Sequence, residues 1–209
     1  NTNDMKKIIL LILVLFTFIN IHATHIMGGE ITWVCIKDPT NADVGKYIFK
    51  MKVYRDCDGT TLGTGTEFID VWDGGVNPIT SITLAWVSNT DISPAGNALN
   101  SGNACLDCNT NPVGAVEEYI YESQPIALVG TPPATGWFFT WDSCCRNGAT
   151  TNLVLSSTTS PSEGFTLRAS MFPYTDASGN ILPADPCYDN SPKFNESPKT
   201  IICIGYSFF

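Results

Sequence analysis

The sequence predicts an all-β protein, an antiparallel β-sandwich of the Ig-like or jelly-roll-like kind that disulfides staple together. Short segments of alternating apolar and polar residues follow one another, separated by glycine, asparagine, aspartate and proline. No apolar repeat of helical period occurs after residue 23. Eight cysteines follow a leader-like N-terminus, which is typical of an exported, disulfide-linked domain. A jelly roll remains the alternative to an Ig-like sandwich.

The N-terminus predicts a signal peptide. Residues 1–4 lie before the first methionine and have the character of spurious upstream sequence. Two lysines then precede an apolar run over residues 8–21, and Ala23 offers a small residue for cleavage before Thr24. This run is shorter than the roughly 20 residues that a membrane anchor needs. We therefore expect a mature chain of residues 24–209 without a membrane-spanning segment, secreted or held at the cell surface.

Alternation places the strands along the mature chain. The clearest pattern is in residues 46–55, where Tyr47, Phe49, Met51 and Val53 share one face. The predicted strands span residues 30–35, 46–55, 67–72, 79–87, 116–121, 126–128 (a short edge strand), 137–141, 152–155 and 165–171. Together they predict one β-sandwich domain over residues 24–172, in which the aromatic run 137–141 is a buried strand.

The C-terminal part of the sequence differs in composition. Residues 173–199 contain many prolines and few periodic apolar residues, which predicts a linker. Residues 200–209 begin a new strand pattern, so we expect them to be the first strand of a following, truncated Ig-like domain.

The cysteines predict a disulfide framework. Cys144 and Cys145 are adjacent, and a bond between neighbours would strain the backbone, so each is expected to reach a different distant cysteine. Cys35 and Cys57 lie at opposite ends of a predicted hairpin, beyond a disulfide's reach. A bond from Cys57 to Cys144 or Cys145 is the pairing that the strand ends favour. The framework comprises Cys35, Cys57, Cys105, Cys108, Cys144, Cys145, Cys187 and Cys203.

The sequence offers no catalytic residues and no cofactor site. The mature chain has one histidine, His25, whereas nucleophilic catalysis needs a positioned base. Cys105 and Cys108 lack the helix of a redox pair, and zinc sites need more paired cysteines or histidines. Calcium prefers several carboxylate oxygens. Its weak candidates surround one predicted hairpin: Asp56, Asp58, Glu67, Asp70 and Asp73.

The net charge and the tryptophans indicate which kinds of binding partner the protein can have. The net charge of −9 excludes a nucleic-acid footprint, because lysines and arginines are few and scattered. All five tryptophans lie on predicted strands, and most should be in the core. One or two on an outer face would be able to stack on a sugar or a protein partner. These tryptophans are Trp33, Trp72, Trp86, Trp137 and Trp141.

Four motifs in series resemble a known family. They occupy residues 25–33 (HIMGGEITW), 53–57 (VYRDC), 143–147 (SCCRN) and 190–194 (NSPKF). The series resembles the N-terminal region of large secreted surface proteins of Bacteroidetes, the gliding-motility-associated and adhesin-like proteins with many Ig-like or PKD-like repeats. The resemblance implies a cell-surface location, type IX secretion and further Ig-like domains in the same polypeptide.

Together these inferences predict a non-enzymatic N-terminal module of a large secreted cell-surface protein. Its role would be adhesion, surface binding or structural capping, with a surface glycan or a protein as the ligand. The alternative is a carbohydrate-binding accessory module of a secreted polysaccharide-degrading enzyme. That alternative predicts a row of outward-facing aromatic residues.

Overall fold

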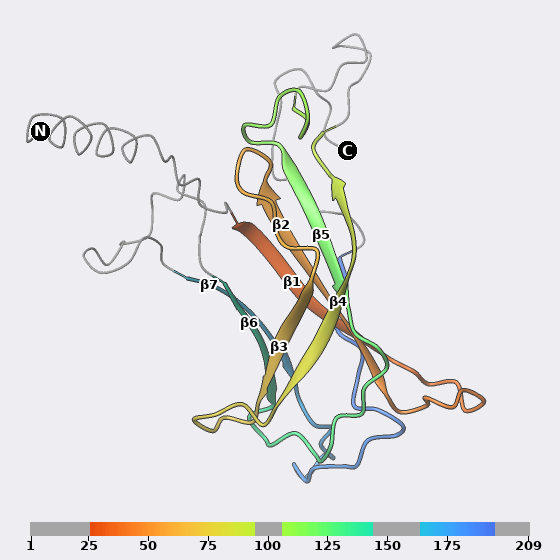
Figure 1. The fold of residues 1–209 in the computed structure, drawn as a ribbon. Helices are drawn as coiled ribbons and strands as arrows, with labels where there is room; N and C mark the ends of the chain where they lie inside the picture. Colours follow the sequence, from red (N-terminus) through yellow and green to blue (C-terminus); the bar gives the residue numbers. More distant parts are fainter. Residues whose placement is uncertain (1–25, 95–105, 144–163, 195–209) are drawn as a thin grey trace, which may run out of the picture.

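The structure, a computed structural model, describes residues 26–94, 106–143 and 164–194. Within these ranges seven strands form one antiparallel sheet in the order β1-β2-β5-β4-β3-β6-β7 (Figure 1). The strands are β1 (Ile26–Cys35), β2 (Tyr47–Asp56), β3 (Thr66–Trp72), β4 (Thr80–Asp91), β5 (Val116–Glu122), β6 (Trp137–Ser143) and β7 (Phe165–Met171). The predicted fold class, all-β, antiparallel and disulfide-stapled, is confirmed.

The two edge strands of this sheet, β1 and β7, approach each other, so the sheet closes on itself as a sandwich. Gly29 lies at the point of closest approach. A Cβ atom there would lie 2.5 Å from the Lys52 carbonyl oxygen and 2.7 Å from Cδ1 of Leu167. Glycine is therefore required for β7 to pack on β1 at this position.

The core lies between the two halves of the folded sheet. The predicted inner face of β2 is buried, including Phe49 and Met51. The Phe139 ring on β6 lies 4.8 Å from the Phe49 ring and 5.2 Å from the Trp33 ring, centroid to centroid, so residues from opposite halves interdigitate. Fully burying each such side chain stabilises the fold by roughly 1.5–3 kcal/mol.

Strand boundaries differ modestly from the predicted ones. β1 begins at Ile26, four residues before the predicted start, and β4 continues to Asp91 with an irregularity between Trp86 and Ser88. The predicted edge strand 126–128 is reduced to one bridge, in which the Tyr47 N–H donates to the Ile126 carbonyl oxygen at 2.9 Å. The predicted strands 152–155 and 200–209 lie outside the described residues.

Residues 173–194, predicted as part of a linker, instead pack against the sheet. Cys187 is buried and bonded to Cys35 at the end of β1. The backbone N–H of Trp33 donates to Ser191 Oγ at 2.8 Å, and that of Cys35 donates to Asn190 Oδ1 at 2.6 Å. The linker assignment is wrong for this segment because a disulfide, the buried Tyr188 and polar side chains attach it to the sheet, and a periodic apolar pattern signals none of these.

The described residues contain no helix of the length and apolar character that crossing a membrane requires.

Candidate ligand-binding face

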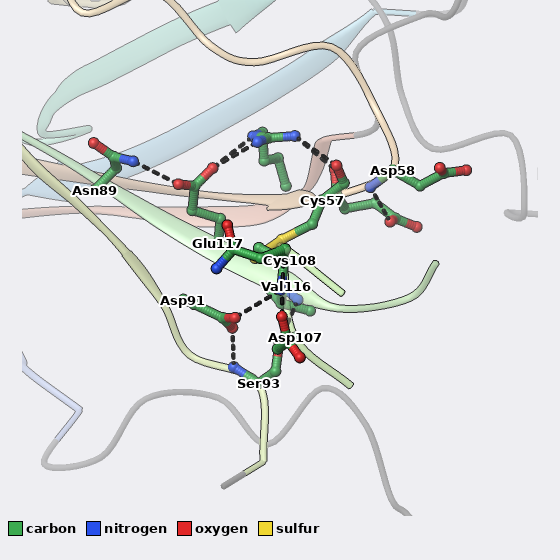
Figure 2. Close-up of a disulfide and its surroundings, with 12 residues drawn as sticks. Cys57, Asp58, Asn89, Asp91, Ser93, Asp107, Cys108, Val116 and Glu117 are labelled. Carbon is green, nitrogen blue, oxygen red and sulfur yellow. Dashed lines mark hydrogen bonds and ion pairs between the residues drawn. A yellow bond between two sulfur atoms is a disulfide. The ribbon is translucent and has the colours of Figure 1, made fainter. Parts of the chain in front are cut away.

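The end of the sheet where β2 stops is held by a buried arginine and a disulfide. Arg55 donates through Nη1 to the carbonyl oxygens of Asp56 and Gly59, both at 2.9 Å, and pairs with Glu117 on β5. Cys57, in the turn that Arg55 organises, bonds to Cys108 (Figure 2). The Tyr-Arg-Asp-Cys motif is thus a structural device that joins this turn to β5 and to the segment around Cys108.

Carboxylates near this disulfide accept hydrogen bonds from backbone N–H groups. Figure 2 shows Asp91 accepting from the N–H groups of Ser93 and Cys108, both at 2.8 Å. Asp107 accepts from the N–H groups of Asn109 and Thr110, also at 2.8 Å. These bonds, with the Thr110 hydroxyl first among the causes, lower the pKa of Asp107. The carboxylates therefore hold the backbone of Ser93 and of residues 108–110 in place.

The calcium candidates do not come together. Asp56 and Asp58 lie where β2 ends, beside the end of β4. Asp70 and Asp73 lie near the end of β3, beside the start of β4 and so at the opposite end of the sheet. Glu67 accepts a hydrogen bond from Trp141 Nε1 at 2.9 Å. The idea that these residues share a site is wrong, and the described residues hold no group of three or more metal-ligating side chains.

The disulfides correct one predicted pairing. Cys57 bonds to Cys108, not to Cys144 or Cys145. The prediction failed because the strand order brings β5, and the segment before it, beside the end of β2. Cys35 and Cys57 do not bond to each other, as the hairpin geometry predicted. Other predicted positions lie outside the described residues: Ala23, Thr24, His25, Cys105, Cys144, Cys145 and Cys203.

The tryptophans divide between the core and the surface. Trp33, Trp137 and Trp141 are buried. Trp72 is half-buried on the solvent-facing side of β3, and Trp86 is 37% exposed. Sequence reasoning also missed an outward aromatic residue, Phe138. The prediction of a buried strand over residues 137–141 takes no account of its outer face, to which strand alternation sends the even-numbered positions.

We define the outer face as the solvent-facing side of β4, β3, β6 and β7. The register fixes its rows across the strands. Asp70 lies opposite Ser81 on one side and Thr140 on the other, and Thr140 lies opposite Arg168. Its members are Ser81, Thr83, Phe68, Asp70, Trp72, Phe138, Thr140, Asp142, Thr166, Arg168 and Ser170.

Aromatic and polar side chains on the outer face hold one another in place. The guanidinium carbon of Arg168 lies 3.9 Å from the centroid of the Phe138 ring, a close cation–π contact. Trp72 lies beside Phe138 and donates from Nε1 to Thr140 Oγ1 at 2.8 Å. Phe68, in contrast, is 56% exposed. Because Trp72, Phe138 and Arg168 are held in place, they can bind a ligand with little loss of conformational entropy.

The polar row from Ser81 to Arg168 lies between two aromatic positions on β3. Phe68 precedes Asp70 by two residues and Trp72 follows it by two, so both point outward on either side of the row. At roughly 3.3 Å of rise per residue, the two aromatic positions are about 13 Å apart along the strand. The outer face therefore offers two flat apolar surfaces separated by hydrogen-bonding groups.

A groove of about 420 Å³ on the opposite half of the sheet is the other candidate. It lies over β1 and β2 and includes Lys50, Lys52 and Glu30. Its charges are largely satisfied within the protein. Lys50 pairs with Glu122 at 3.0 Å, and Lys52 lies 3.5 Å from Glu30.

Lys52, which lines this groove, also pairs with the buried Glu118. The buried Oε2 of Glu118 has the Lys52 ammonium 3.1 Å away as its counterion. Burial is the largest influence on the pKa of Lys52 and lowers it, but Glu118 and Glu30 together outweigh burial and raise the pKa. Because these ionic groups neutralise one another, the outer face is the better candidate for ligand binding.

The comparisons with known proteins do not add a family or a relative. The two disulfides indicate an oxidising environment, in agreement with an extracellular location. No protein-family model matches the chain, and neither the curated proteins nor the solved structures contain a significant match.

Proposed function

We propose that this chain is a non-enzymatic binding module of a large secreted cell-surface protein, acting in adhesion through the outer face. The observation that carries the proposal is that the exposed Phe68 shares the outer face with Trp72, Phe138 and Arg168, whose side chains are held by contacts on that face. Rigid aromatic residues and arginine are the side chains that most often dominate binding energy at recognition surfaces. This observation favours ligand binding over a role in structural capping.

The cellular setting in this proposal rests on sequence and covalent structure. The signal-peptide pattern of the first 23 residues predicts export. The disulfides Cys35–Cys187 and Cys57–Cys108 agree with an oxidising compartment. The resemblance of the four motifs to Bacteroidetes surface proteins supports a place at the N-terminus of a multidomain adhesin. The non-enzymatic assignment rests on the single histidine, His25, of the mature sequence.

An adhesion assay tests the proposal. The protein is produced by export to a bacterial periplasm, so that its disulfides form, and is then coupled to microspheres. The microspheres are passed under flow over surfaces of cellulose, chitin, mucin and collagen. We expect retention on at least one surface, and we expect Phe68→Ala to reduce it. Phe194→Ala is the matched control, because Phe194 is 79% exposed and lines the groove over β1 and β2 instead. Absence of retention on all four surfaces, or equal loss in both variants, would contradict the proposal.

A carbohydrate-binding accessory module of a secreted polysaccharide-degrading enzyme is the second candidate. It is favoured by one observation, the outward placement of Phe68 and Trp72 on one strand. The complete sequence of the gene distinguishes the two candidates. A catalytic domain in the same polypeptide supports the accessory module, and a series of Ig-like repeats supports the adhesin.

A further inference from the structure

We propose that the outer face binds an uncharged polysaccharide chain that runs along β3 and stacks on Phe68 and Trp72. This inference rests on the proposed binding function and names the ligand class. The groups that carry it are the two aromatic side chains, the polar row between them and the charge balance of the face.

Stacking is the first part of the argument. A pyranose ring has an apolar face of C–H bonds, and an aromatic ring offers a flat apolar surface with a partly negative face to receive it. Phe68 is 56% exposed and lies about 13 Å along β3 from Trp72. A single sugar ring is too small to cover both positions. The spacing therefore requires a ligand of several linked sugars.

Hydrogen bonding is the second part. Between the aromatic positions lie Ser81, Asp70, Thr140 and Arg168, contributed by four different strands. Hydroxyls both donate and accept, a carboxylate accepts, and a guanidinium only donates. Ser81 already donates to Asp70 at 2.5 Å and Trp72 to Thr140 at 2.8 Å, which fixes these groups. Their remaining oxygen lone pairs accept and Arg168 donates, so the row offers both acceptors and donors to sugar hydroxyls.

Arg168 is the donor whose position is best fixed. Its guanidinium lies over the Phe138 ring, with 3.9 Å between the guanidinium carbon and the ring centroid. Stacking uses the face of the guanidinium and leaves its N–H edges available. Phe138 therefore acts as a positioning residue that holds the guanidinium of Arg168 on the outer face, where its N–H groups can donate to a ligand.

Charge selects an uncharged ligand over an anionic one. Asp70 and Asp142 face outward with one cation, Arg168, so these three side chains sum to −1. The whole chain carries −9. A polyanion such as a uronic-acid polymer would meet repulsion from both the face and the molecule. A neutral polymer keeps the stacking and the hydrogen bonds without that cost.

Affinity electrophoresis tests this inference with soluble polysaccharides. The full chain is run through native gels that contain hydroxyethylcellulose, xylan or galactomannan as uncharged probes, or polygalacturonate as the anionic probe. We expect retardation by at least one uncharged probe and none by polygalacturonate. Phe68→Ala should weaken the binding about tenfold, the equivalent of about 1.4 kcal/mol. Arg168→Lys keeps the charge but loses the planar fork, and should weaken it about threefold to tenfold.

The controls separate this inference from the broader proposal. Phe194→Ala should bind as the unchanged protein does, and thermal melting of each variant checks that Phe68→Ala is folded. No retardation by any uncharged probe, or stronger binding to polygalacturonate, overturns the inference. If microspheres still adhere to collagen or mucin in a Phe68-dependent way, the binding function stands and only the polysaccharide assignment is lost.

Discussion

The buried Arg55 and the partly buried Glu117 form an ion pair between β2 and β5, with Nη2 of the guanidinium 2.6 Å from Oε2 of the carboxylate. The same guanidinium donates to backbone carbonyl oxygens in the turn that contains Cys57. One side chain thus satisfies a carboxylate and several partly buried backbone acceptors. A buried charge of this kind costs the most when only one partner is removed.

Arg55→Met should therefore destabilise the protein by about 1.5–3 kcal/mol, because the partly buried Glu117 would lose its counterion and the turn carbonyl oxygens would lose their donor. Chemical denaturation followed by tryptophan fluorescence measures this change. Lys50→Met is the matched control, since the Lys50–Glu122 pair is partly exposed and should contribute less than about 1 kcal/mol. If the two substitutions cost the same, Arg55 does not have the role described.

Gly29→Ala should destabilise the protein by about 1–3 kcal/mol. The new methyl group would meet the Lys52 carbonyl oxygen and the Leu167 side chain, and the backbone oxygen cannot move without disturbing the β1–β2 pairing. Gly65→Ala controls for the loss of glycine flexibility, because no atom lies within 4 Å of the added Cβ. Equal melting temperatures for the two variants would show that β1 and β7 do not approach as described.

The two disulfides should differ in their contribution to stability. Their cysteines are separated by 152 residues for Cys35–Cys187 and 51 residues for Cys57–Cys108. In the chain-entropy account, the longer loop contributes about 1 kcal/mol more. Serine replacement of both cysteines of each pair, followed by denaturation, tests this order. Mass spectrometry of unreduced peptides checks the pairing itself, and a Cys57 peptide linked to Cys144 or Cys145 would refute it.

Stability should decline at alkaline pH. Burial is the main reason that the pKa of Tyr47 rises from 10.0 to about 12, and burial also raises the pKa values of Tyr54 and Tyr121. The unfolded chain loses these protons near pH 10, whereas the folded chain retains them. The stabilisation is therefore complete below pH 10 and is lost as the pH rises toward 12.

Denaturation at a series of pH values, with phenolate absorbance as a second measurement, tests this window. Tyr47→Phe should reduce the alkaline loss while lowering stability at neutral pH, because the Tyr47 hydroxyl accepts a hydrogen bond from the Tyr188 N–H at 2.8 Å. Stability that is constant from pH 9 to 12 would contradict the burial of these phenols.

Alternation along the sequence was a reliable guide to individual strands. The inner face of β2 follows directly from a period of two residues, which the backbone of a strand imposes. The same rule applied to residues 137–141 would have placed Phe138 outside, so that signal was present in the sequence. The path of residues 173–194 was not predictable in this way, because side chains such as Ser191 attach it to β1 without any periodic pattern.

The outer face shows where sequence reasoning ends. Alternation alone places Phe68, Asp70 and Trp72 on one side of β3. Their proximity to Thr140 and Arg168 depends on the order β3-β6-β7, which no local pattern encodes. The pairing of Cys57 with Cys108 depends in the same way on the adjacency of β2 and β5. Spacing alone allows 105 pairings of eight cysteines.

The hydrogen bonds that complete β1 come from residues far along the chain, and this affects biogenesis. Ser191 follows Trp33 by 158 residues. During synthesis, the edge of β1 remains without this partner until nearly all of the described residues have been made. An open strand edge is a template for pairing with another molecule. Partial translocation or premature cleavage before residue 187 should therefore yield aggregates rather than a smaller soluble domain.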